Sequence, residues 1–259
     1  MKTITLCCTC ALLFVAGTTR ICAQRGDPVA PGYNLEPGFP TDLVDAYAIE
    51  HKSFNAQGFA RYERTDDDRD HFVFRPKVAY GIVPFAHIEA SVTFFTGNAD
   101  RTGSGDLRLG GNYQFLDEQG FVPALAIIPA LDIPSGKNSR GLDTTLTLAA
   151  TRAFPLPSDA NDRLHFNISW LRNAGRESGE RGNYYRAAFG YSRELLHNLA
   201  VVIDFVREEQ RIKKHESNIV EGGALYQLND QITISFSAGF GIAAESPDFR
   251  LGTGFQWNF

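Results

Sequence analysis

Cysteine is scarce in this sequence, and all four cysteines (Cys7, Cys8, Cys10 and Cys22) precede residue 23. The rest of the chain therefore has no thiolate to bind a metal and no disulfide to stabilise a small domain. Its stability must come from burial or from a closed network of hydrogen bonds.

Long apolar runs and basic clusters are also lacking. After Gly26 no stretch reaches the ~18 apolar residues that indicate a spanning helix, which excludes helical membrane spans. Removing Lys2 and Arg20 from the 25 basic residues leaves 23 against 30 acidic ones, a net charge of −7. This balance argues against nucleic acid as a partner, because phosphate binding requires clustered lysine and arginine.

The first 23 residues have the pattern of an export signal. Lys2 gives a positive start, Ile4 to Gly17 is a mostly apolar run, and Ala23 provides a small residue at the expected cleavage point. The run is shorter than the ~20 apolar residues of a spanning helix. We expect a cleaved signal peptide over residues 1–23, with a buried N-terminal helix as the alternative.

From Tyr47 onward the chain is a series of segments in which apolar and polar residues alternate. Such alternation places apolar side chains on one face of a strand and polar ones on the other. It is clear in 72–80, 88–94, 107–115, 164–170, 232–240 and 249–259, less clear in 121–133, 142–154, 183–193, 198–208 and 217–228, and weakest in 47–64. The pattern predicts about twelve strands, an even number as in bacterial membrane barrels.

Two kinds of connection alternate along the chain. Short turns fall near Val83-Pro84 and at 117–120, 196–198 and 228–230, with 155–162 as a longer member of this set. Polar or charged stretches fall at 65–71, 96–105, 134–141, 173–182 and 208–216. An up-and-down barrel has this asymmetry, with tight turns at one end and larger loops at the other. Residues 24–46, rich in proline and glycine, predict an irregular lead-in that is disordered or lies against the barrel mouth.

Aromatic residues on the apolar face form two groups, one at each predicted end. Near the short turns are Tyr80, Phe115, Phe121, Phe154, Tyr191, Tyr226, Trp257 and Phe259, and near the loops are Phe72, Phe94, Trp170, Tyr185, Phe205, Phe240 and Phe249. Two aromatic belts are typical of a protein that meets two lipid–water interfaces. The sequence therefore predicts an all-β, transmembrane, up-and-down antiparallel barrel over 47–259, in the outer membrane of a Gram-negative bacterium. A soluble secreted all-β domain is the alternative.

The chain ends on an alternating stretch, DFRLGTGFQWNF, whose last outward residues are Phe255, Trp257 and Phe259. A terminal Phe preceded by apolar residues at alternate positions resembles the sorting signal read by the barrel assembly machinery. We expect outer-membrane lipid and this machinery as partners.

The polar alternate positions predict a lumen lined by charge. These residues are Arg75, Lys77, His87, Glu89, Asp106, Arg108, Asp132, Arg186, Asp204, Glu221 and Arg250. On the lipid face near the midplane an arginine would cost ~2–4 kcal/mol, so hydrated or paired positions inside the barrel are favoured. Such residues could form a structural network that fills the barrel or a polar path for a solute. Barrel size does not decide, because eight-stranded barrels are filled and sixteen-stranded ones are open.

The most distinctive stretch is SGDLRLGGNYQFLDEQGFVPALAIIPALDIPSGK, residues 104–137. It has a Ser-Gly-Asp strand entry, a strand ending in Tyr-x-Phe, and Pro-Ala-Leu-Ala running into Pro-Ser-Gly; Tyr80-Gly81-Ile82 comes before the turn that leads to Ile88-Glu89. With these features residues 47–259 resemble the outer-membrane transporter family named for the meta-pathway of phenol degradation. The resemblance implies uptake of small hydrophobic or aromatic compounds and supplies no catalytic residues. A non-transporting structural or surface-contact barrel is the alternative function.

Two patterns favour other chemistry only weakly. His165, Asn167 and Ser169 could suggest a membrane phospholipase, but they alternate on one strand and would face the lumen, whereas a lipid-cleaving site must face the bilayer. Asp66-Asp67-Asp68 could hold a divalent cation, although a solvated acidic loop is the simpler interpretation. We therefore expect no enzyme activity, no cofactor and no bound metal.

Overall fold

The computed structural model describes residues 33–259 except 66–68, 99–101, 138 and 156–160. The predicted signal peptide and Asp66 to Asp68 lie outside the described residues. Among those described, no helix is long and apolar enough to cross a membrane.

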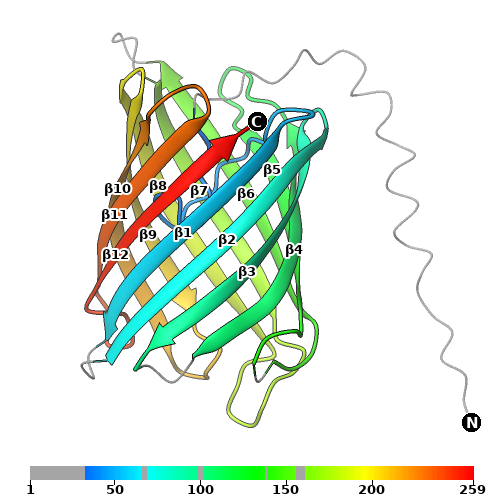
Figure 1. Ribbon diagram of the computed structural model, residues 1–259, viewed down its shortest axis with the longest axis vertical. Helices are drawn as coiled ribbons and strands as arrows, with labels where there is room; N and C mark the ends of the chain where they lie inside the picture. The colour runs from blue at the N-terminus through cyan, green and yellow to red at the C-terminus, as the bar shows by residue number, and fades with distance from the viewer. Residues whose placement is uncertain (1–32, 66–68, 99–101, 138, 156–160) are drawn as a thin grey trace, which may run out of the picture.

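The chain forms a closed antiparallel barrel of twelve strands, as the alternating pattern predicts (Figure 1). The strands are β1 (Phe54–Thr65), β2 (Arg69–Val83), β3 (Ala86–Gly97), β4 (Gly103–Leu116), β5 (Ala124–Ile133), β6 (Asp143–Pro155), β7 (Asn161–Arg172), β8 (Asn183–Leu196), β9 (Leu199–Glu209), β10 (Glu216–Gln227), β11 (Ile232–Gly241) and β12 (Phe249–Asn258). Each strand pairs with its neighbours in sequence, and β1 pairs with β12 from Asn55↔Asn258 to Arg64↔Phe249. Closure leaves no unpaired strand edge, which a barrel in lipid requires.

Side chains alternate between the outer surface and the lumen. In β12, Leu251, Phe255 and Trp257 are 50%, 50% and 47% exposed, whereas Arg250 and Gln256 are 2% and 7% exposed. The outward face is apolar along the other strands as well, with Phe72, Phe94, Tyr185 and Phe240 near one end and Tyr80, Phe115 and Tyr226 near the other. This surface suits a lipid environment.

The two ends of the barrel differ in their connections. β2–β3, β8–β9 and β10–β11 are joined by short turns at the end where β12 finishes, at the top of Figure 1. Longer connections such as 134–142, 173–182 and 242–248 lie at the opposite end. In outer-membrane barrels the short turns are periplasmic and the longer loops extracellular, and we name the two ends accordingly.

Residues 33–53, here called the inner segment, precede β1, and most of them, up to Ile49, lie inside the barrel (Figure 1, dark blue). Backbone amides of the segment bond inward side chains of several strands. Asp42 N–H donates to Asp204 of β9 (3.1 Å), Val44 to Asn167 of β7 (3.0 Å), Ala46 to Thr151 of β6 (3.0 Å) and Ile49 to His87 of β3 (3.1 Å). The barrel wall therefore satisfies backbone groups that have no strand partner of their own.

The inner segment enters and leaves at the periplasmic end. The Tyr33 hydroxyl bonds Ser192, close to the periplasmic end of β8, at 3.2 Å. Asp42 reaches Arg250, the second residue of β12, close to the extracellular end. The chain then returns, and Lys52 N–H donates to the carbonyl of Gly81 near the β2–β3 turn at 2.8 Å.

Apolar packing explains why some strands alternate poorly in the sequence. Leu35, Phe39 and Leu43 of the inner segment pack in one buried cluster with Ala188, Ala200, Val202, Val206 and Leu225 of β8, β9 and β10. A second cluster joins Ala46 to Ala124, Ala126 and Ala149 of β5 and β6. These wall residues point inward although they are apolar, because the inner segment rather than water covers them.

Two strand glycines make room for the inner segment. A Cβ atom on Gly190 of β8 would lie 2.3 Å from Cδ1 of Leu43, and one on Gly223 of β10 would lie 2.8 Å from Cβ of Pro40. A larger residue at either position would displace the segment. The small residues at these two wall positions therefore leave space for Leu43 and Pro40 of the inner segment.

The expectation for residues 24–46 needs correction where the structure describes them. Residues 33–46 are neither disordered nor against the barrel mouth, and the first strand begins at Phe54 rather than at Tyr47. The prediction failed because the segment's structure depends on contacts with distant strands and not on a local hydrophobic period.

The C-terminal residue offers a test of the proposed assembly signal. Phe259 faces outward and packs on Phe54 and Trp257, with ring centroids 4.9 and 4.7 Å apart. Phe259→Ala should lower the amount of folded barrel in the outer membrane several-fold, while the stability of barrels already formed changes by only ~1.5–3 kcal/mol, the value of burying one Phe. Quantifying heat-modifiable protein in membrane fractions measures the first, and unfolding in lipid measures the second.

Gln256 provides the matched control, because it faces inward on the same strand and accepts a hydrogen bond from Gln57 (2.9 Å). Gln256→Ala should leave the membrane level nearly unchanged. Equal losses from the two variants would show that Phe259 is not read during assembly.

Candidate solute pathway in the lumen

A cavity of about 370 Å³ lies inside the barrel and is here called the lumen cavity. Its walls are inward side chains of β1 to β8 with Arg211 of the loop between β9 and β10, and the inner segment contributes Leu35, Glu36, Pro37, Asp42, Val44 and Tyr47. The wall formed by β9 and β10 packs mainly against the inner segment. The lumen is thus asymmetric, with the segment on one side and the cavity on the other.

Most charges around the lumen cavity are neutralised in pairs. Lys77 lies between Glu36 of the inner segment and Glu89 of β3, with Lys77 Nζ 3.2 Å from the Glu89 carboxylate. Arg108 contacts Asp132 with two hydrogen bonds of 2.8 and 3.0 Å. Paired, half-buried charges create a polar lining without a large field of one sign.

Asp42 is the main electrostatic anchor of the inner segment. Its carboxylate lies 2.9 Å from Arg250, 3.1 Å from Arg186 and 3.5 Å from Arg61. Burial alone would raise the pKa of Asp42, but the guanidinium groups of Arg250, Arg186 and Arg61 together hold it well below its usual range. Asp42 is therefore ionised at neutral pH and ties the segment to three strands.

Arg250 extends this anchor to β10, two strands from its own. It is 2% exposed and contacts Glu221 of β10 as well as Asp42. Asp204 of β9 lies next to the same group, since it accepts the backbone N–H of Asp42. Removing any one charge would leave its partners buried with fewer counter-charges.

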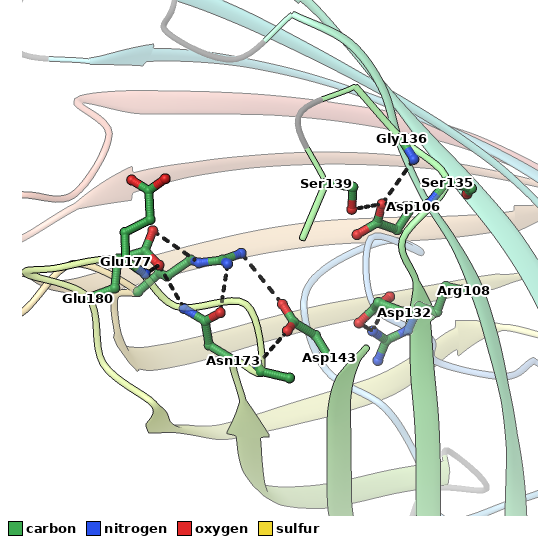
Figure 2. Close-up of polar contacts among 12 residues, drawn as sticks. Asp106, Arg108, Asp132, Ser135, Gly136, Ser139, Asp143, Asn173, Glu177 and Glu180 are labelled. Atoms are coloured by element: carbon green, nitrogen blue, oxygen red, sulfur yellow. Dashed lines mark hydrogen bonds and ion pairs between the residues drawn. The ribbon is translucent and has the colours of Figure 1, made fainter. Parts of the chain in front are cut away.

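The extracellular rim of the lumen cavity is held by cross-loop contacts (Figure 2). Asp106 of β4 accepts hydrogen bonds from the amides of Ser135 (3.3 Å) and Gly136 (3.1 Å) and from the Ser139 hydroxyl. These bonds fold the 134–142 loop back onto β4.

Arg211 links further parts of the rim through Asn173, Glu180 and Asp143, which are labelled in Figure 2. It donates to Asn173 at 2.6 Å and lies 3.3 Å from Glu180 and 3.5 Å from Asp143. Loops 173–182 and 210–215 are therefore tied to the start of β6.

The residues predicted to face the lumen lie in two groups. Arg75, Lys77, His87, Glu89, Asp106, Arg108, Asp132 and Arg186 line the lumen cavity, whereas Asp204, Glu221 and Arg250 lie among the contacts around Asp42. Sequence reasoning missed Arg61, because β1 alternates weakly, and missed Glu36 and Asp42, because they precede the strands. The unexplained apolar inward positions in β9 were the available signal for an internal partner.

The residues considered for lipid hydrolysis do not converge on one site. His165 bridges Thr151 (3.2 Å) and Ser192 (2.8 Å), Asn167 holds the backbone of Val44, and Ser169 contacts Thr147 at 2.7 Å. All three lie inside the barrel and are nearly buried. Over the ranges that the structure describes, no group of three or more acidic, histidine or cysteine side chains could hold a metal ion.

Known proteins share this architecture. The COG4313 outer membrane channel from Pseudomonas putida F1 has a TM-score of 0.60 and 15% identity, covering 87% of this chain and 100% of that one. The KdgM porin has a TM-score of 0.54 and 12% identity over 78% and 99% of the two chains, and the NanC porin 0.52 and 13% over 79% and 98%. At these identities the likeness concerns the fold.

In comparisons of sequence, the chain matches a family model but no individual curated protein. A family model described as "Putative MetA-pathway of phenol degradation" matches residues 43–259, which include the second half of the inner segment. No curated protein matches the chain.

Proposed function

The chain belongs to the family whose model covers residues 43–259 and is an outer-membrane β-barrel, and from this premise we propose that it is a channel for small polar solutes. The inner segment controls passage, because it fills the part of the lumen next to β8, β9 and β10 and leaves only the lumen cavity beside it. Solutes enter the lumen cavity from the extracellular end.

The observation that carries this proposal is the lining of the lumen cavity. Charged groups such as Lys77, Glu89, Arg108 and Asp132 face it, together with hydroxyls such as Ser91 and Thr147. A hydrophobic solute would displace water from these charged and hydroxyl groups without replacing the lost hydrogen bonds, which is unfavourable. The lining therefore favours polar solutes over the hydrophobic compounds that the family resemblance implies.

A hydrophobic solute could instead bind to an apolar hollow on the outer surface. An apolar hollow of about 550 Å³ lies on the outer surface of β1, β2, β3, β11 and β12, between Tyr62, Phe72, Phe74, Phe236 and Leu251. The backbone pairing of β1 with β12 beneath it is continuous, with Ala60↔Thr253 and Arg61↔Gly252 in register. This continuity favours lipid contact there over lateral passage between β1 and β12.

Liposome swelling with the purified protein tests the proposal. Glycerol and arabinose should enter proteoliposomes faster than protein-free liposomes, and a trisaccharide should not, because the lumen cavity is only about 370 Å³. Protein that has been boiled before reconstitution is the control. Permeation no faster than in protein-free liposomes for every solute would favour a non-transporting structural barrel.

Uptake by a deletion strain separates the solute classes. Loss of growth or uptake on small polar compounds supports the proposed channel. Loss confined to hydrophobic and aromatic compounds would contradict the polar assignment and restore the expectation drawn from the sequence.

A further inference from the structure

One arginine on the wall of the lumen cavity differs from its charged neighbours. Lys77, Arg108 and Arg186 each have a carboxylate partner within ion-pair distance. In the described part of the chain, Arg75 of β2 has none. Its guanidinium instead donates to the carbonyl of Pro37 in the inner segment.

The surroundings of Arg75 hold the side chain in place without neutralising it. The guanidinium carbon lies 5.4 Å from the centroid of the Phe59 ring, its cross-strand neighbour on β1. Such a cation–π contact orients the group and stabilises it. One carbonyl uses only part of a guanidinium that has five N–H donors.

We propose that Arg75 is a binding point for the carboxylate of a small organic acid that enters the lumen cavity. This inference rests on the proposed channel function and assigns it a class of solute. The planar guanidinium fork matches a carboxylate in a two-point contact, which a lysine ammonium cannot reproduce.

The neighbouring residues favour a monoanion with an apolar part over a multiply charged anion. Asp42 and Glu89 also line the lumen cavity, and their negative charge opposes a phosphate or a dicarboxylate. Phe59, Phe95 and Leu171 line the same cavity and can contact a short hydrocarbon chain. Butyrate has both features and is a suitable probe.

The test compares ion currents through single channels of the full-length mature protein in planar bilayers. In constant sodium chloride, butyrate should reduce the current in a concentration-dependent way, whereas its neutral analogue butyramide should not. Arg75→Gln should raise the half-blocking concentration of butyrate by at least about tenfold, the loss expected for a charge-assisted hydrogen bond. Arg75→Lys, which keeps the charge without the fork, should give an intermediate value.

Arg207→Gln is the matched control, because Arg207 is an exposed strand arginine paired with Glu216 at 2.7 Å. It should leave butyrate block unchanged. Heat-modifiable migration shows that each variant is folded, and Arg75→Lys decides the question if Arg75→Gln does not assemble.

The outcomes separate this inference from the proposed function. A wild-type protein that carries no current and passes no neutral solute contradicts the channel itself. A wild-type channel that conducts but is not blocked by butyrate, or is blocked equally after Arg75→Gln, overturns the carboxylate site and leaves the channel function standing.

Discussion

Excision of residues 33–49 should raise the single-channel conductance of the barrel several-fold. These residues fill the side of the lumen next to β8, β9 and β10, and they form part of the wall of the lumen cavity. Residues 50–53 stay in place because they bond the β2–β3 turn through Gly81. Without the segment, water and ions can occupy the space of Leu35, Phe39 and Leu43, so the conducting cross-section grows.

A disulfide lock gives the same test without a deletion. Ala46 and Thr151 contact each other through a 3.0 Å hydrogen bond between segment and wall. In Ala46→Cys/Thr151→Cys, oxidation should suppress channel opening and a reductant should restore it. The sequence has no cysteine after Cys22, so in protein without the predicted signal peptide this pair is unambiguous.

Each single-cysteine variant controls for the substitutions themselves and should not respond to the reductant. Two results together would show that the inner segment does not control passage. The conductance would be the same with and without residues 33–49, and the conductance of the double-cysteine variant would be the same under oxidising and reducing conditions.

The sequence allowed the barrel to be predicted but not the inner segment, for a physical reason. A strand in lipid must alternate along its own length, so residues such as Phe249, Arg250 and Leu251 reveal both strand and facing from a short window. The inner segment has no such local rule. Its conformation follows from contacts such as Val44 with Asn167, which are 123 residues apart in sequence.

For the charged residues of the lumen, too, the sequence predicts the facing of a side chain but not its partners. Alternation was enough to indicate that Arg75 and Arg250 face inward, because facing is a local property. Their different roles were not predictable, since Arg250 is paired by Asp42 of the inner segment and by Glu221, while Arg75 has no ion pair among the described residues and contacts a carbonyl and a ring. Those partners come from segments that are distant in sequence.

Arg250→Met should destabilise the folded barrel by about 3–5 kcal/mol, the loss typical when one partner of a buried ion pair is removed. Arg250 is 2% exposed, and Glu221, its partner on β10, is 3% exposed. Methionine keeps much of the side-chain volume, so the main effect is an uncompensated carboxylate at Glu221. Asp42 loses less, because Arg61 and Arg186 remain beside it. Denaturant unfolding of the protein in lipid vesicles measures the change.

A second substitution distinguishes lost charge balance from lost packing. In Glu221→Gln/Arg250→Met the buried carboxylate at position 221 is neutralised along with its partner, so the double variant should be more stable than Arg250→Met alone. Arg207→Met, at an exposed pair with Glu216, should cost no more than about 1 kcal/mol. If Arg250→Met were no more damaging than Arg207→Met, the Asp42–Arg250–Glu221 contacts would not be a stabilising anchor. The inner segment would then depend on its apolar clusters alone, and Leu43, with no exposed surface, would become the residue whose truncation releases it.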